Sequence, residues 1–388
     1  MMWAATPGAR RLGSACLLTA VAGVLVLIVA GREGGPWLPS YLFVWLFVLG
    51  LSLGSLALVA VHNLTGGDWG RGTRPFAQGA LRLMPLGALL SLPLLFAPAQ
   101  LLPWLHSSAA SPRGGAVSGQ LWYLNPSFFY ARAILYFAVW LTLARVLSHD
   151  DRAAARRPGR RGPSLQAVSA AGFVLYALTT TFAAVDWTMA LTPSWHSTVF
   201  GLLIGTGQAL SALAAATLCA YVMTPAADAQ LRQRFHDFGN LALALVLVWA
   251  YLALMQYLII WIEDLPDEIP WYVLRTRTSW SKLTSFIVVT HFAVPLVFLL
   301  WRRAKRTPGV LAAVAALLLL ACLADSFWLV VPIFRPRGFQ LQWSDLGALL
   351  AIGGVWLGCL VLASGAPAAK PLPGAVTGGA REHGAQPT

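Results

Sequence analysis

Long apolar runs, separated by short polar segments, recur along the whole chain. A membrane-spanning helix needs about 20 mainly apolar residues, and a backbone inside hydrocarbon satisfies its own hydrogen bonds best as a helix. The runs are too long and too uniformly apolar for the strands of a membrane β-barrel. We therefore predict an all-α integral membrane protein with about ten transmembrane helices, at residues 12–30, 40–62, 79–103, 121–148, 165–185, 197–223, 237–262, 279–301, 310–333 and 343–363.

The composition agrees with a chain covered by lipid. Hydrophobic residues make up 58% of the 388 positions and charged residues only 11%, against about 25% charged residues in soluble domains. This balance excludes a soluble enzyme, a disordered protein and a nucleic-acid-binding domain, although the net charge is +13. We expect residues 1–364 to form a single polytopic membrane domain and the Ala/Pro/Gly-rich residues 365–388 to form a disordered cytoplasmic tail.

Lysine and arginine residues are distributed unevenly between the two sides of the predicted membrane domain. The N-terminus, alternate loops and the tail hold eighteen of them, and the opposite loops hold seven. Cytoplasmic loops carry the excess of positive charge, so both termini are predicted to be cytoplasmic. Arg10 and Arg11 precede the first apolar run, as basic residues precede the apolar part of a signal peptide. No clean small-x-small cleavage site precedes Arg32, so we expect this run to be retained as a helix.

Ionisable side chains inside the spans are predicted to lie in one layer between the midplane and the outer face. At a helix rise of about 1.5 Å per residue, Arg132 lies about 16 Å below the outer end of its run, His291 about 18 Å and Asp325 about 12 Å. Further polar residues at this depth or nearer the outer mouth are Tyr251, Gln256, Asp186, His196, Glu263 and Lys282.

A charge at this depth costs several kcal/mol unless it is paired, so such residues usually face the bundle interior and often serve a function. One interpretation is a structural ion pair, such as Arg132 with Asp325. The other is a site for proton transfer or for a protonatable ligand, because an arginine, a histidine and an aspartate share one depth. For His291 alone, a role in packing is a further alternative.

The chain offers no recognisable ligand set for a cofactor of its own. The four cysteines, in apolar runs, have no CxxC, haem-attachment or zinc spacing. Only His291 of the seven histidines is deep, whereas a b haem between helices commonly needs two facing histidines. Phosphate-binding loops and dinucleotide fingerprints do not occur in the sequence. We expect no metal or cofactor on this chain, no catalytic residue and no catalysis by the isolated chain.

The second half of the chain contains several motifs in one order. They are DWTMALTPSWHSTVFG at 186–201, HDFGNLALALVLVWAYLALMQYLIIWIEDLPDEIPWYVLR at 236–275, HFAVPLVFLLWRRAKR at 291–306 and LADSFWLVVPIF at 323–334. This block resembles the F subunits of bacterial alternative complex III, a quinol:acceptor oxidoreductase. These subunits belong to the NrfD-like superfamily of polysulfide-reductase membrane subunits. The first 160 residues match only in hydropathy and number of spans.

The resemblance implies two four-helix bundles plus two peripheral helices in the bacterial cytoplasmic membrane. It implies a homologous membrane C subunit, and iron–sulfur and multihaem cytochrome c subunits, as partners. It associates this subunit with scaffolding and proton conduction, and leaves open whether quinol binds here or on the C subunit. His291 and Asp325 correspond to buried protonatable residues, and the outer-half motif residues are Asp186, His196, Tyr257 and Glu263. Arg132 lies outside the block and is a candidate from its depth alone.

Three functions remain after this reasoning. The first is an integral membrane subunit of an alternative complex III-like quinol:cytochrome c (or other acceptor) oxidoreductase in a respiratory chain. The second is an NrfD-like membrane anchor of a polysulfide- or nitrite-type reductase, and the third is a secondary transporter with a polar site at the midplane. Neighbouring genes for multihaem cytochromes and a large iron–sulfur protein would favour the first two.

Overall fold

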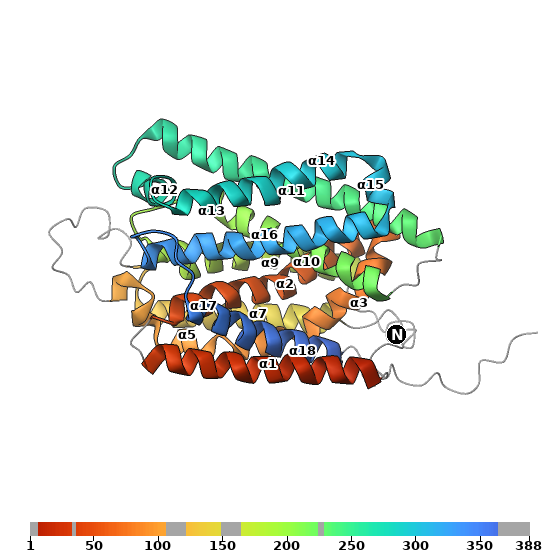
Figure 1. Ribbon diagram of the computed structural model, residues 1–388, viewed down its shortest axis with the longest axis horizontal. Coiled ribbons are helices and arrows are strands. Elements are labelled where there is room, and N and C mark those ends of the chain that lie inside the picture. Colours follow the sequence, from red (N-terminus) through yellow and green to blue (C-terminus); the bar gives the residue numbers. More distant parts are fainter. Residues whose placement is uncertain (1–6, 33–35, 106–121, 149–163, 224–228, 364–388) are drawn as a thin grey trace, which may run out of the picture.

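The spans predicted from hydropathy are present as helices. A computed structural model describes residues 7–32, 36–105, 122–148, 164–223 and 229–363. Within these ranges, nine helices are long and apolar enough to cross a membrane, and a bent pair makes a tenth span. Figure 1 shows the helices running side by side along one direction. The described residues contain no strand, which confirms an all-α multi-span membrane protein.

The helix boundaries lie within a few residues of most predicted spans. The helices are α1 (Pro7–Arg32), α2 (Leu38–Thr65), α3 (Trp69–Arg82), α4 (Met84–Leu89), α5 (Leu92–Phe96), α7 (Pro126–Leu147), α9 (Leu165–Trp187), α10 (Phe200–Met223), α11 (Ala229–Glu263), α12 (Ile269–Thr276), α13 (Trp280–Ile287), α14 (Val294–Leu300), α15 (Arg302–Arg306), α16 (Pro308–Phe334), α17 (Trp343–Ala348) and α18 (Gly354–Ala363). Short π-helical segments, Val288–Ala293 and Leu349–Gly353, join α13 to α14 and α17 to α18.

The third span differs from the prediction because it is broken. Helices α3 and α4–α5 meet at an angle of 41° next to Leu83. Pro85 and Pro93 lie at the starts of α4 and α5, where the missing proline N–H interrupts the helical hydrogen bonds. The polar segment before residue 79 was expected to be a loop, but α3 begins at Trp69 and buries one face in the bundle.

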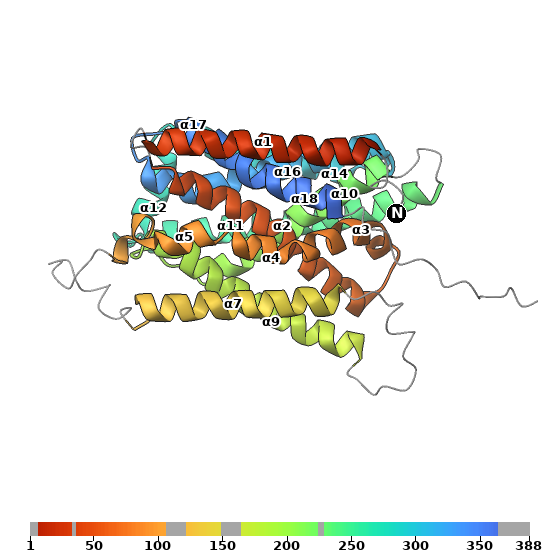
Figure 2. The same cartoon turned by 90° about the horizontal axis from the view of Figure 1, so that it is seen from below.

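Helix α2 is the most deeply buried span, and it packs against α3, α9, α10 and α16. Helix α10 also packs against α9, α11 and α16. Helix α1 packs on α17 and α18 at one edge of the molecule, which both cartoon views show (Figures 1 and 2).

Glycines allow the closest helix contacts. A Cβ atom at Gly54 of α2 would overlap the backbone carbonyl of Gln208 in α10. A Cβ atom at Gly23 of α1 would also overlap backbone atoms of Gly347 and Ala351, and one at Gly354 would overlap the Cys16 carbonyl. Membrane helices use small residues at interfaces because packing, rather than water exclusion, drives their association. These positions therefore bring α2 against α10 and α1 against the last span.

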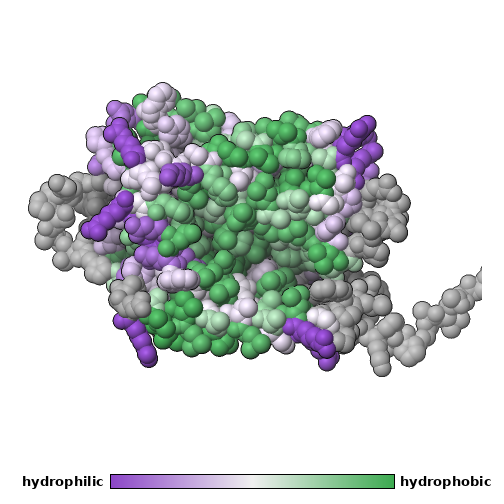
Figure 3. Space-filling view, viewed as in Figure 1, coloured by the Kyte–Doolittle hydropathy of each residue, from purple (hydrophilic) through white to green (hydrophobic). Residues whose placement is uncertain are grey.

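The surface has an apolar belt between two polar ends (Figure 3). Exposed apolar side chains in this belt include Leu18, Ile134 and Val297, each about two-thirds or more exposed. Lipid is the solvent that such a surface needs. The loop at 149–163 and the tail predicted to be disordered (365–388) lie outside the described residues.

Candidate functional site

The deep polar side chains form two separate groups rather than one layer. We call Arg132, Asp186, Tyr136 and Tyr123 the outer cluster. Arg132 donates to Asp186 through Nε–H···Oδ2 (2.9 Å) and Nη2–H···Oδ1 (2.7 Å), and Tyr136 donates its hydroxyl to Oδ2 (2.7 Å). The remaining Nη1 of Arg132 donates to the Tyr123 carbonyl at 2.9 Å. In such a bidentate pair, two parallel N–H···O bonds join the guanidinium to the carboxylate, which strengthens the ion pair and fixes its geometry.

The depth and the predicted partner of Arg132 were both wrong. Asn125 caps α7 by accepting from the Phe128 N–H at 2.9 Å, and Pro126 is the first helical residue. Arg132 is therefore only six residues into its helix, about 9 Å by helix rise. At that level it meets Asp186 near the outer end of α9 and forms its ion pair there, not with Asp325.

Aromatic rings enclose the outer cluster. The guanidinium carbon of Arg132 lies 3.8 Å from the centroid of the Tyr123 ring and 4.4 Å from that of Phe128. Burial and the charge of Asp186 raise the pKa of Tyr123 above its usual value, so its phenol stays protonated. A guanidinium over an aromatic face gains a favourable cation–π contact. The ion pair of the outer cluster is thus hydrogen-bonded and shielded by aromatic rings, whereas the buried Tyr123 hydroxyl has no hydrogen-bond partner.

The second group lies deeper, between α11, the π-helical segment after α13, and α16. We call His291, Asp325, Trp249 and Cys322 the midspan cluster. His291 has no exposed surface and stacks on Trp249, with ring centroids 3.8 Å apart. Its Nε2 atom lies 3.7 Å from Cys322 Sγ, and Asp325 follows Cys322 by one helical turn. Trp249 also lies beside Asp325.

His291 occupies an irregular part of its span. It lies in the π-helical segment Val288–Ala293. Pro295 follows four residues later and cannot donate an N–H to the His291 carbonyl, which breaks the regular α-helical pattern. Such π segments occur often at functional sites. Cys322, rather than Asp325, is the residue bonded to the imidazole.

A cavity adjoins Asp325 inside the bundle. Its volume is about 60 Å³, and one water molecule needs about 10–15 Å³ by the same measure, so a few waters fit. Its polar lining residues are Thr188, Gln208, Ser211, Cys322, Asp325 and Ser326. Gln208 accepts a hydrogen bond from the Tyr176 hydroxyl at 2.9 Å. This lining can hold water against a carboxylate.

The midspan cluster differs from the outer cluster in the pairing of its carboxylate. His291 Nδ1 and Trp249 Nε1 are buried atoms without a hydrogen-bond partner, and so is the Tyr123 hydroxyl of the outer cluster. No ion pair to Asp325 occurs among the described residues. Buried polar groups are nearly always paired, and exceptions mark strain, bound water or a functional group. The arrangement can therefore accept, hold and release a proton more readily than the outer cluster.

The other predicted residues do not join the midspan cluster. Gln256 is buried near the outer surface, where it accepts from Ser197 Oγ (2.8 Å) and donates to Tyr272 Oη (3.0 Å). Tyr257 packs edge-on against Tyr272. Tyr251 is 60% exposed on the lipid side, so its predicted place among the interior residues was wrong. Glu263, the last residue of α11, is exposed.

His196 lies at a separate outer cavity of about 280 Å³. The cavity is lined mainly by apolar and aromatic side chains, among them Trp122, Phe182 and Trp195. None of the midspan cluster residues lines this cavity. The outer-half motif residues are thus divided among several local environments.

Sequence reasoning missed the role of Arg275, a fully buried cation on α12. Its Nε and Nη2 donate to the carbonyls of Trp328 (3.2 Å) and Leu329 (2.9 Å), and its guanidinium carbon lies 3.6 Å from the Trp271 ring centroid. Pro332 cannot donate to the Trp328 carbonyl, so Arg275 replaces that donor. Burial lowers the pKa of Arg275 to about 9, which leaves it charged at neutral pH.

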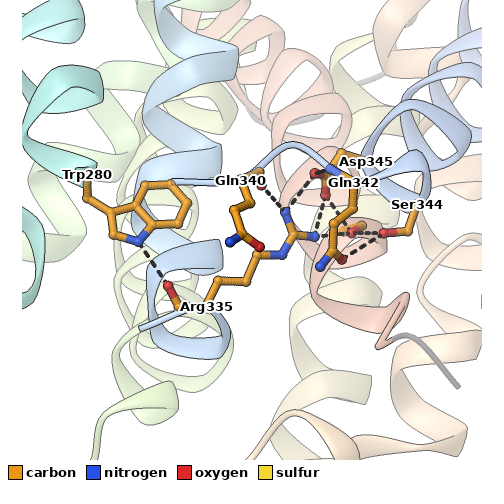
Figure 4. Close-up of polar contacts among 7 residues, drawn as sticks. Trp280, Arg335, Gln340, Gln342, Ser344 and Asp345 are labelled. Atoms are coloured by element: carbon orange, nitrogen blue, oxygen red, sulfur yellow. Dashed lines mark hydrogen bonds and ion pairs between the residues drawn. The ribbon is translucent and has the colours of Figure 1, made fainter. Parts of the chain in front are cut away.

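A second missed group joins the outer ends of four helices. Arg335 and Asp345 form a buried ion pair through two contacts of 2.7 and 2.8 Å (Figure 4). Ser40 of α2 donates to Asp345 at 2.6 Å, and Trp280 of α13 donates its indole N–H to the Arg335 carbonyl at 3.0 Å. Arg335 is one of the seven lysine and arginine residues counted in the opposite loops, and a sequence does not show which loop residues fold inward.

Comparisons with known proteins add no relative. No protein-family model matches the chain, and a search of the curated proteins finds no match.

Proposed function

We propose that this chain is an integral membrane subunit of an alternative complex III-like quinol oxidoreductase. Its contribution would be a scaffold and a path for protons. The motifs that carry the resemblance fall on α9 through α16, and these helices hold Asp186 and the whole midspan cluster. The multi-span helical fold is compatible with this role.

The observation that carries the proton-conduction proposal is the position of Asp325. Its carboxyl group borders a cavity large enough for water, and it has no cationic partner among the described residues. An ion-paired carboxylate is held in its charged form, whereas an unpaired one in an apolar bundle can change protonation state at modest cost. Intramembrane carboxylates with histidine neighbours are typical of proton relays.

Electron transfer would take place on the partner subunits. The resemblance assigns iron–sulfur clusters and c haems to them, and assigns a homologous C subunit as the neighbour in the membrane. Quinol oxidation releases two protons for every two electrons. In this proposal, Asp325 and His291 receive or pass on protons, and quinol itself is bound on the C subunit or between the two membrane subunits.

The direct test uses the complex isolated through a tag on this chain. We expect c-haem and iron–sulfur subunits to co-purify in mild detergent. Asp325→Asn and His291→Gln should assemble normally but lower quinol oxidation or its coupling to acidification, because an amide cannot carry a proton at neutral pH. Asp267→Asn, the same change in the exposed outer loop, is the matched control. Normal coupled turnover in both cluster variants would remove the proposal for this cluster.

Failure of assembly, with unchanged turnover per assembled complex, would instead assign Asp325 a structural role. Purification of the chain without any redox subunit would favour the transporter alternative. A polysulfide- or nitrite-type reductase among the co-purified subunits would favour the NrfD-like anchor.

The proposed location is the bacterial cytoplasmic membrane, with both termini in the cytoplasm. Arg303 on α15 and Asp267 before α12 are exposed and lie in loops on opposite sides of the predicted bilayer. A single cysteine at 267 should react with an impermeant thiol reagent in intact cells whose outer membrane has been made permeable, and one at 303 should not. Reaction at 303 alone would reverse the orientation.

A further inference from the structure

Cys322 lies between the two protonatable residues of the midspan cluster. Its thiol sulfur is 3.7 Å from His291 Nε2, and the residue also lines the cavity that Asp325 borders. Cys322 is 6% exposed and His291 has no exposed surface. The sulfur therefore links the imidazole to the cavity, since no direct hydrogen bond joins His291 to Asp325.

The contact restricts the chemistry of the histidine. In a neutral imidazole one nitrogen carries the proton and the other accepts. When the thiol donates, Nε2 is the acceptor and the ring proton is on Nδ1. The partner of one ring nitrogen thus sets the state of the other, and Nδ1 is the buried atom that has no partner.

We infer that Cys322 is a positioning residue for His291: its thiol holds the ring and its tautomer, and connects the ring to the cavity beside Asp325. This inference rests on the proposed proton-conducting function. Cys322 carries no proton onward itself in this scheme; Asp325 and His291 remain the protonatable groups. A buried cysteine can also act as a small apolar residue, and the two roles predict different behaviour of conservative variants.

The test compares Cys322→Ser, which keeps a hydroxyl donor, with Cys322→Val, which fills the volume without one. In the purified complex we expect the valine variant to lose coupled turnover by roughly fivefold, the effect of one hydrogen bond, and to shift the pH at half-maximal turnover. The serine variant should retain turnover and the pH profile. Cys359→Val, in the peripheral α18, is the control and should match the unmodified complex.

Wild-type turnover and pH profile in the valine variant would overturn the inference and leave Cys322 as a packing residue. Equal losses in the serine and valine variants would overturn it as well, because the donor would then not be the property that matters. Asp325→Asn is measured in parallel. Normal coupled turnover there removes the proposed function itself, whereas a loss there with an unaffected valine variant removes only the role of Cys322. If the valine variant does not assemble, Cys322→Ala takes its place in the comparison with serine.

Discussion

The outer and midspan clusters each place one aspartate inside the helix bundle, but only the aspartate of the outer cluster has an ion-pair partner among the described residues. Asp186 accepts three hydrogen bonds, two from Arg132 and one from Tyr136. Asp325 borders a cavity and has no ion-pair partner among the described residues. A carboxylate held by a bidentate arginine and a tyrosine hydroxyl is a fixed charge that joins helices. A carboxylate beside water-sized space can exchange a proton.

The largest effect should follow from breaking the outer cluster. Arg132→Ala leaves Asp186 buried without its counter-charge, which typically costs about 3–5 kcal/mol. We expect the free energy of unfolding in detergent to fall by this amount and the level of assembled protein in membranes to drop. Arg145→Ala removes an exposed arginine from the same helix and should change stability by less than about 0.5 kcal/mol. Equal stability of the two variants would contradict the structural role of the pair.

A smaller loss of stability is expected for Arg275, a buried cation that donates to backbone carbonyls rather than to a carboxylate. Arg275→Ala leaves the Trp328 and Leu329 carbonyls without their donor, at a cost of about 1–3 kcal/mol. The cost should be the same at pH 6 and pH 8, because the lowered pKa of about 9 keeps Arg275 charged at both. Arg277→Ala, at an exposed position on the same segment, should have little effect. Thermal unfolding of both variants at the two pH values provides the measurement.

Replacing both members of the outer pair should restore most of the stability lost in the single variant. Buried ion pairs can often be exchanged for apolar residues of similar volume at little cost. Arg132→Met combined with Asp186→Leu is therefore expected to be more stable than Arg132→Ala, within about 1.5 kcal/mol of the unmodified protein. A double variant as unstable as the single one would show that Tyr136 and Tyr123 depend on the charges themselves.

The smallest change in stability is expected at Asp325. Its replacement by asparagine removes no ion pair, so we expect the free energy of unfolding to change by less than about 1 kcal/mol. This contrasts with the loss of proton-coupled turnover proposed for the same variant. Denaturation of the variant complex checks the prediction, and a loss as large as that of Arg132→Ala would erase the difference between the two clusters.

The sequence predicted the spans well because their apolar length is a property of each segment alone. It also placed His291 and Asp325 well inside apolar spans, and both lie inside the helical segments Trp280–Leu300 and Pro308–Phe334. The predicted depth of Arg132 was wrong because the apolar run begins several residues before the helix, which starts at Pro126. The pair Asn125–Pro126, a preferred N-cap followed by a proline suited to the first helical position, was the available signal.

The rotation of each helix about its own axis was harder to predict from the sequence than the position of the span. Spans that are apolar on nearly every side give little indication of which face meets lipid, so Tyr251 was placed in the interior although it is largely exposed. The cavity beside Asp325 depends on residues from α2, α10 and α16 together. Gln208 and Cys322 acquire their positions only through that packing, and no local pattern marks either residue.

The contact between α1 and the last span has a consequence for biosynthesis. Gly13 packs on Leu362, and Gly23 on Gly347, so the first helix finds its partner only after more than 300 further residues have been made. At about 5–20 residues per second, translation of that stretch takes roughly 20–70 seconds. During this time α1 must remain stable in lipid alone or be shielded by the insertion machinery. Most of its apolar side chains are exposed and can contact lipid, and the small residues Gly13, Ala20 and Gly23 are buried where the last span packs, which suits that delay.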